Sequence, residues 1–264
     1  MYKKIIVLAA MLAILLAGYF YWGGKSDFET SDLPAVSYEE ATEAIEVVAD
    51  NTENDSSPVI EETVEAERPK ETNLPGELNL AVPFTSQAPK ANWDLPYQEM
   101  CEEASVYMVA EYFAGTKAGK IDAEKADSAL LQAIAFEEEL LGTYLDTTAE
   151  ETVKFIESFY GLEAQVIKNP TVEEIKAEVA AGRPVIVPAA GRQLGNPNFT
   201  GEGPLYHMLV IKGYTAGTFI TNDPGTRNGE NYVYDIATIM EAMGDWNDGS
   251  PATGAKVVIF VSKP

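Results

Sequence analysis

The chain contains one cysteine and one histidine, so any thiol or imidazole chemistry must use Cys101 and His207. A cysteine thiolate is a strong nucleophile, and a histidine that is distant in sequence but close in space can act as its base. One cysteine cannot form an intramolecular disulfide, and the pair is too small for a zinc site built on several thiolates or imidazoles. These residue types therefore indicate nucleophilic catalysis, and we expect neither a metal ion nor another cofactor.

Cys101 begins a segment, 101–114, whose apolar residues recur with the 3.6-residue period of a helix. A helix N-terminus offers unpaired N–H groups and the positive end of the helix dipole, which favour thiolate over thiol. His207 begins a β-branched run, and Asp223 follows a second such run sixteen residues later. A hairpin between the two runs would bring Asp223 beside His207, where a carboxylate can hold the ring tautomer and stabilise the imidazolium.

Asn222 is an alternative partner for the histidine, but successive side chains of a strand point to opposite faces, so only one of the two neighbours can face it. A carboxylate stabilises an imidazolium better than an amide does, which favours Asp223. Each residue also has a common structural role: a lone cysteine is often a small buried hydrophobe, and Asn-Asp-Pro-Gly is typical of a turn. The order Cys, His, Asp, each at the end of an expected element, favours catalysis.

The elements that would position these residues form two groups. Helical periodicity and two capping boxes predict helices over 101–114, 123–141, 149–160 and a segment that ends at Gly182. Short β-branched runs then predict strands at Pro184–Pro188, His207–Tyr214, Thr218–Thr221 and Lys256–Val261, and Leu78–Phe84 is expected to form an edge strand. Helices followed by strands predict an α+β domain in which a helical half packs on an antiparallel sheet.

Three motifs, in this order, resemble the C39-like cysteine peptidases, a family related to the double-glycine leader peptidases. They are VPFTSQ (Val82–Gln87) followed by Trp93 and CEEAS (Cys101–Ser105), then HMLVIKGY (His207–Tyr214), then NDPGTRNGENYVYD (Asn222–Asp235). The resemblance covers roughly residues 78–264. It implies a papain-like fold, thiol hydrolysis of an amide bond, and a catalytic triad of Cys101, His207 and Asp223.

The resemblance also implies that a glutamine upstream of the cysteine stabilises the oxyanion, together with the backbone N–H of Cys101. Gln87 matches the family's Ser-Gln motif and is the preferred residue, and Gln98 is the alternative. Glu102 departs from the pattern of many relatives, which carry glycine there; its carboxylate opposes ionisation of the thiol, although it suits a helix N-terminus. The polar, glycine-rich loop 191–206 is either a wall or lid of the substrate cleft or a passive connection.

Two segments precede the domain at 78–264. Residues 1–24 carry Lys3 and Lys4 before eighteen uncharged residues, which predicts a transmembrane anchor with the rest of the chain outside the cytoplasm, or a cleaved signal. Residues 25–77 are strongly acidic and predict a disordered, extended linker, in which 37–50 has the Ala and Glu content of a transient helix.

The net charge of −24 and the pI near 4.3 exclude nucleic acid as a partner, because phosphates would be repelled. The sequence therefore predicts an extracytoplasmic, membrane-anchored cysteine peptidase that acts on a peptide or protein substrate. Two alternatives stay open: a papain-like amidase that acts on cell-wall peptides, and a non-catalytic member of the fold that binds peptides. Nothing in the sequence indicates an oligomeric state.

Overall fold

The computed structural model describes residues 30–43 and 74–264. A sheet with the strand order β2-β7-β3-β4-β5-β6 forms the centre of the domain, and every neighbouring pair of strands is antiparallel. The bounds are Leu78–Asn79 (β1), Glu163–Lys168 (β2), Val185–Ala190 (β3), Tyr206–Tyr214 (β4), Thr218–Asn222 (β5), Tyr232–Asp235 (β6) and Val257–Ser262 (β7). The short β1 pairs with the end of β4.

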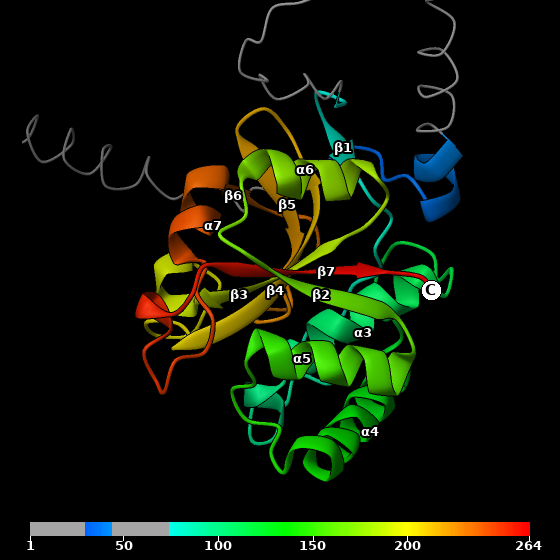
Figure 1. Cartoon of the computed structure of the whole chain (residues 1–264). Coiled ribbons are helices and arrows are strands. Elements are labelled where there is room, and N and C mark those ends of the chain that lie inside the picture. The colour runs from blue at the N-terminus through cyan, green and yellow to red at the C-terminus, as the bar shows by residue number, and fades with distance from the viewer. Residues whose placement is uncertain (1–29, 44–73) are drawn as a thin grey trace, which may run out of the picture.

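Helices cover the sheet on both sides. They are α3 (Cys101–Phe113), α4 (Ala123–Leu141), α5 (Ala149–Phe155), α6 (Val172–Ala180) and α7 (Ile236–Ala242). Figure 1 shows α3, α4 and α5 gathered on one side of the sheet and α6 on the other. The predicted α+β arrangement, a helical half against an antiparallel sheet, is confirmed.

The helix boundaries follow local sequence signals. Both predicted capping boxes are present, at Thr148 and Glu151 for α5 and at Thr171 and Glu174 for α6. Helix α4 ends at Gly142, whose φ of 80° is a left-handed conformation that glycine adopts at little cost.

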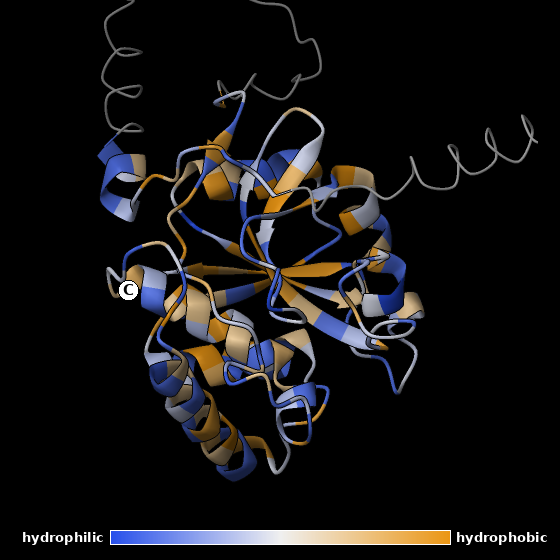
Figure 2. Ribbon diagram, turned by 180° about the vertical axis from the view of Figure 1, so that it is seen from behind, coloured by the Kyte–Doolittle hydropathy of each residue, from blue (hydrophilic) through white to orange (hydrophobic). Residues whose placement is uncertain are grey.

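The core lies between α3 and the central strands, and it holds the two halves of the domain together. Strands β3 and β4 are buried along their whole length, as the continuous apolar sequence of β3 suggests, and β4 also buries His207 and Lys212. In Figure 2 the central strands are the most consistently hydrophobic elements. The buried Ser105 hydroxyl of α3 donates to the Met208 carbonyl of β4 at 3.0 Å, which fixes the start of the helix against the start of the strand.

Several elements differ from the expectations. The edge strand expected over Leu78–Phe84 is regular only at Leu78–Asn79, and three elements were not predicted: β2, β6 and α7. Strand β2 lies at the edge of the sheet, and its EAQVIK sequence alternates without a continuous apolar run. Strand β6 and helix α7 are short, so their sequences contain too few periods to be recognised.

The expectation of a disordered linker is wrong for residues 30–43. Val36 exchanges backbone hydrogen bonds with the chain beside β1, donating to the Asn79 carbonyl at 2.8 Å and accepting from the Ala81 N–H at 2.7 Å. Residues 38–43 form a short helix, and its Tyr38 ring packs edge-on against Phe113 of α3 at 5.6 Å. These apolar contacts tether an otherwise acidic segment to the domain.

The expected membrane segment at residues 1–24 and most of the expected linker lie outside the described residues. Within 30–43 and 74–264, no helix combines the length and the apolar character needed to cross a bilayer.

Candidate active site

A cavity of about 500 Å³ lies where the N-terminal end of α3 meets the start of β4. The cysteine and the histidine of the chain both line it, as do both candidate glutamines. The lining residues that matter for the chemistry are Gln87, Gln98, Cys101, Glu102, Phe199 and His207. The structure therefore brings together groups that are more than one hundred residues apart in the sequence.

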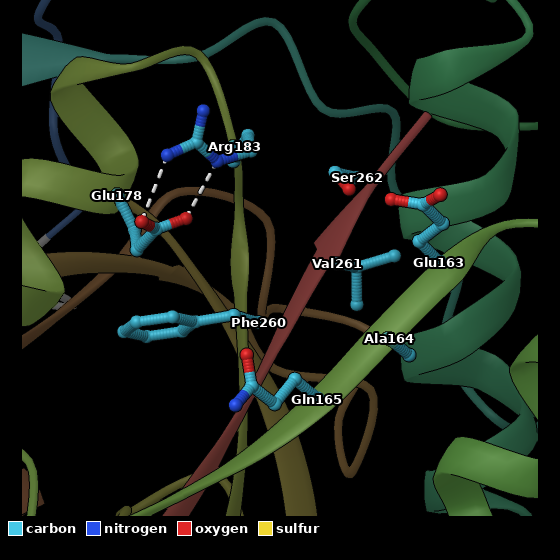
Figure 3. Close-up of a pocket in the computed structure, with 8 residues that line it drawn as sticks. All are labelled: Glu163, Ala164, Gln165, Glu178, Arg183, Phe260, Val261 and Ser262. Atoms are coloured by element: carbon cyan, nitrogen blue, oxygen red, sulfur yellow. Dashed lines mark hydrogen bonds and ion pairs between the residues drawn. The ribbon is translucent and has the colours of Figure 1, made fainter. Parts of the chain in front are cut away.

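A second hollow, of about 290 Å³, lies over β2, β7 and the end of α6 (Figure 3). Its charged feature is an ion pair in which Arg183 donates two hydrogen bonds to Glu178, at 2.6 and 2.8 Å. None of its lining residues is a cysteine or a histidine, and the guanidinium is already satisfied by the carboxylate. The candidate chemistry therefore belongs to the cavity at Cys101.

Cys101 is the first residue of α3 and is buried. Its Sγ donates a hydrogen bond to Oε2 of the next residue, Glu102, at 2.9 Å. Burial raises the pKa of the Cys101 thiol well above its ordinary value, and the Glu102 carboxylate raises it further. Desolvation and the neighbouring negative charge therefore oppose the thiolate that the helix N-terminus is expected to favour.

His207 is the second residue of β4 and is buried. Its Nε2 lies 2.7 Å from Oδ1 of Asp223, which follows β5 directly. The β4–β5 hairpin makes this contact possible, as the spacing of the two residues predicts. Since Nε2 is occupied by the carboxylate, Nδ1 is the ring nitrogen that remains for proton transfer.

Asp223 is fully buried but is well satisfied by donors. Its Oδ2 accepts from the Tyr234 hydroxyl at 2.6 Å and from the Asn196 amide at 3.0 Å, and its Oδ1 also accepts from the Gly225 N–H at 2.9 Å. Burial alone would raise the pKa of Asp223, but the charge and hydrogen bond of His207, with the other donors, outweigh burial and lower the pKa below its usual value. This carboxylate is therefore an anion poised to stabilise an imidazolium.

The imidazole of His207 is held by close packing as well. The Phe199 ring meets it edge-on, with centroids 5.3 Å apart. A Cβ at Gly225 would lie 2.8 Å from the histidine Cε1, so only glycine lets the backbone approach the ring this closely. The turn that follows Asp223 thus forms one wall of the ring's slot.

Asn222 lies away from the histidine. Its amide donates to the carbonyls of Val82 and Pro83, each at 3.1 Å, and its oxygen accepts from the Asn231 N–H at 3.2 Å. The first two bonds tie β5 to the segment that follows β1. Of the two neighbours, the structure places Asp223 at the histidine.

Gln87 lies in the cavity wall with its amide NH₂ committed to the protein. The nitrogen donates to the carbonyls of Tyr97 at 3.0 Å and Gln98 at 2.8 Å, while Oε1 is buried without a hydrogen-bond partner. The Gln87 backbone N–H donates to the Pro224 carbonyl at 2.9 Å. Gln87 thus joins the approach to α3 with the turn after Asp223, and Gln98 lines the same cavity from an exposed position.

A family model described as "Peptidase_C39 like family" matches residues 79–251. The chain belongs to this C39-like peptidase family. A solved structure of a Bacillus anthracis protein, assigned by inference as a C39-like peptidase, is 16% identical, with coverage of 71% of this chain and 98% of that chain and a TM-score of 0.46. A comparison with curated proteins gave no match.

Membership of the C39-like family accounts for the order of the three motifs, but several contacts of the site were not predicted from them. Tyr234 and Asn196, which hold Asp223, lie on β6 and in the loop after β3, and no spacing rule links either residue to the aspartate. The loop 191–206 does form a wall, since residues 199, 200 and 203–206 line the cavity. In the described part of the chain, no cluster of three or more His, Cys, Asp or Glu is arranged to hold a metal ion.

Proposed function

We propose that this C39-like domain is a cysteine peptidase that hydrolyses an amide bond through Cys101, His207 and Asp223. The observation that carries the proposal is that Cys101 and His207 line one cavity while a buried, hydrogen-bonded carboxylate holds the imidazole at 2.7 Å. A buried anion that is this well satisfied is a costly arrangement for a purely structural histidine, and it is the usual support for an imidazolium.

In the proposed mechanism His207 takes the proton of the Cys101 thiol, and the thiolate attacks the carbonyl carbon of the substrate. The tetrahedral oxyanion is stabilised by the Cys101 backbone N–H at the start of α3 and by a glutamine side chain. His207 then protonates the leaving amine, and it later activates the water that hydrolyses the thioester. Asp223 keeps the ring oriented and stabilises its charged form.

Gln87 and Gln98 are both candidates for the glutamine that completes the oxyanion site. Gln87 would have to release one of the two carbonyls to which its NH₂ donates, whereas Gln98 lines the cavity from an exposed position. Gln87 also connects the Tyr97–Gln98 backbone with the Asp223 turn, so its substitution would disturb the alignment of both catalytic elements.

The substrate class in this proposal is a peptide or protein, and the place of action is the extracytoplasmic side of the cell membrane. The support is the sequence at residues 1–24, with two lysines before an apolar stretch that ends in aromatic residues. The test is fractionation of the full chain with membranes, followed by limited external proteolysis. Recovery of a mature protein that begins near Tyr19 would show a cleaved signal in place of an anchor.

The activity is tested with the full chain on a peptide library that includes cell-wall peptides. We expect the wild type to cleave a subset of the library and Cys101→Ala to lose turnover with its circular dichroism spectrum preserved, because the thiol supplies chemistry and little packing. Turnover retained in Cys101→Ala would refute the triad. Cleavage of cell-wall peptides alone would assign the same triad to an amidase.

One observation favours a second candidate, a peptide-binding member that does not catalyse. The Cys101 thiol donates to Glu102, and its pKa is raised, so the nucleophile rests in its less reactive form. A binder would retain the affinity of a captured peptide in Cys101→Ala and would show no product with the wild type over long incubation. Formation of a covalent adduct with a peptide-based thiol probe would exclude it.

A further inference from the structure

Glu102 is held at both of its carboxylate oxygens. Oε2 accepts from the Cys101 Sγ at 2.9 Å, and Oε1 accepts from the Thr147 N–H at 3.2 Å. Thr147 is fixed in turn, because its carbonyl accepts from the buried Tyr206 hydroxyl at 3.0 Å. Glu102 itself is only 2% exposed, so the carboxylate cannot turn toward solvent without breaking both bonds.

The orientation of Glu102 differs from that of Glu103, its neighbour on the same helical turn. Glu103 is fully buried, faces Glu137 of α4, and makes no contact with the thiol. An acidic residue in the first turn of a helix is favourable for the dipole wherever its side chain points. The helix dipole therefore accounts for two glutamates in the first turn of α3. It does not account for the orientation of the Glu102 side chain toward the Cys101 sulfur.

We propose that Glu102 holds the proton of the Cys101 thiol in the resting site and thereby sets the fraction of the nucleophile that is ionised. The proposal deepens the cysteine peptidase function proposed above and rests on it, and it assigns Glu102 as a positioning residue that restrains the thiol. In the resting state the S–H bond is intact and points at Oε2. On activation the S–H bond breaks, an N–H bond forms at Nδ1 of His207, and Glu102 keeps its charge.

The charges that surround the thiol are mostly negative. Glu103 lies on the same helix, Asp146 lies in the turn before α5 and acts on Glu102, and His207 on β4 is the one cation-forming side chain among the cavity residues. Burial raises the pKa of Glu102, and Glu103 raises it further, whereas the hydrogen bond from the Cys101 thiol lowers it and so favours the carboxylate that accepts this bond. Removal of the charge at Glu102 should therefore release the thiol toward ionisation, with no other anion at hydrogen-bond distance to replace it.

Alkylation of Cys101 by iodoacetamide, followed by mass spectrometry from pH 5 to 10 on the detergent-purified full chain, tests this directly. The label is unambiguous because the chain has one cysteine. For the wild type we expect an inflection above that of a free thiol, which lies at about 8.5, because burial and Glu102 raise the pKa of the thiol. For Glu102→Gln we expect the inflection to fall by at least about one unit, with alkylation at pH 7 faster by about tenfold, since the thiolate is the reacting form.

Glu102→Gln is chosen to preserve the local hydrogen bonds, and a second variant controls for the loss of one negative charge. In Glu102→Gln the amide oxygen can still accept from the Thr147 N–H, and the new NH₂ can donate to a thiolate. Glu99→Gln is the matched control, because Glu99 has the same side chain and lines the same cavity, while the hydrogen bond of the thiol goes to Glu102. We expect Glu99→Gln to change the alkylation rate at pH 7 by less than about threefold.

A wild-type inflection at or below pH 8.5 would overturn the proposal without any variant, so misfolding of Glu102→Gln cannot leave it undecided. Equal shifts of the alkylation inflection in Glu99→Gln and Glu102→Gln would also overturn it. The total negative charge of the cavity, and not the hydrogen bond to Glu102, would then determine the pKa of the thiol. Failure of the peptidase function has a separate signature, namely turnover that survives Cys101→Ala, and it leaves the alkylation profile unchanged.

Discussion

The buried carboxyl groups on the two sides of the cavity have pKa values that are shifted in opposite directions. On the β4–β5 side, Asp223 is buried but receives hydrogen bonds from His207, Tyr234, Asn196 and Gly225, and its pKa is lowered. On the α3 side, the buried Glu103 and Glu137 have no lysine or arginine partner in the described part of the chain. One side is built to keep a negative charge and the other to keep protons.

Burial alone does not decide this difference, because Asp223, Glu103 and Glu137 are all fully buried. The deciding quantity is the number of donors that face the carboxylate. Asp223 has four, whereas the buried carboxyl oxygens of Glu103 and Glu137 have no hydrogen-bond partner. The histidine therefore sits beside a fixed anion, while the cysteine sits at the margin of a proton-retaining cluster.

The largest expected effect comes from the side that holds the charge. Asp223→Ala should lower kcat at least tenfold, equivalent to about 1.4 kcal/mol of transition-state stabilisation, because the imidazolium loses its counter-charge. Asn222→Ala is the matched control: it removes bonds to Val82 and Pro83 and should lower stability with kcat nearly preserved in the folded fraction. Steady-state kinetics with the amount of folded enzyme measured by circular dichroism would separate the two. The reverse pattern would reassign the partner of His207.

A smaller effect is expected from the proton-retaining side. Burial raises the pKa of Glu137 to about 8, with Glu102 and Glu151 adding to the shift. A carboxyl group with a raised folded pKa contributes stability that is present below its unfolded pKa of about 4.3 and is lost as the pH rises toward 8. The free energy of unfolding should therefore fall between pH 5 and pH 8.

Glu137→Gln should reduce this pH dependence by at least about 1 kcal/mol, because the amide carries no proton to lose. Urea unfolding at pH 5 and pH 8 measures it. The control is Glu138→Gln, since Glu138 is the exposed neighbour on α4 and should leave the pH dependence unchanged. Identical pH dependence in the wild type and Glu137→Gln would show that the pair does not retain a proton.

The sequence was sufficient for the order and placement of the reactive groups. Cys101 at a helix start, His207 on β4 and Asp223 directly after the paired β5 follow from periodicity and from the length of the connection between the strands. The aim of Glu102 was not predictable, because it depends on a hydrogen bond to Thr147, forty-five residues away. The same holds for the amide of Gln87, whose acceptors belong to the short 3-10 helix Tyr97–Glu99 before α3.

Composition was misleading at residues 30–43. The surrounding segment is acidic enough to predict a disordered linker, yet Tyr38 and Ala41 carry the apolar surface that docks it. Two apolar side chains three residues apart are neighbours on one helix face, and this is a weak signal in an acidic background. Contacts of that kind depend on the partner surface of α3, which a local pattern does not contain.

The smallest effect should come from the removal of one of the four hydrogen-bond donors to Asp223. Tyr234→Phe removes the hydroxyl that donates to Oδ2 at 2.6 Å, while Asn196, Gly225 and His207 remain. The pKa of Asp223 is lowered in the folded protein. The contribution of its charged carboxylate to activity is therefore present at neutral pH and is lost as the pH falls through that pKa. Loss of one donor raises the pKa and moves this acid limb toward neutrality.

We therefore expect kcat/KM at pH 7 to fall by less than about threefold in Tyr234→Phe, with the acid limb of the profile displaced upward by up to about one unit. Tyr232→Phe is the matched control on the same strand, since its ring packs 4.7 Å from that of Tyr234, while the side-chain donors to Asp223 are Tyr234, Asn196 and His207. An unchanged acid limb would mean that three donors already saturate the carboxylate. A fall as large as that of Asp223→Ala would instead mean that the hydroxyl, and not the number of donors, decides how this side of the cavity keeps its charge.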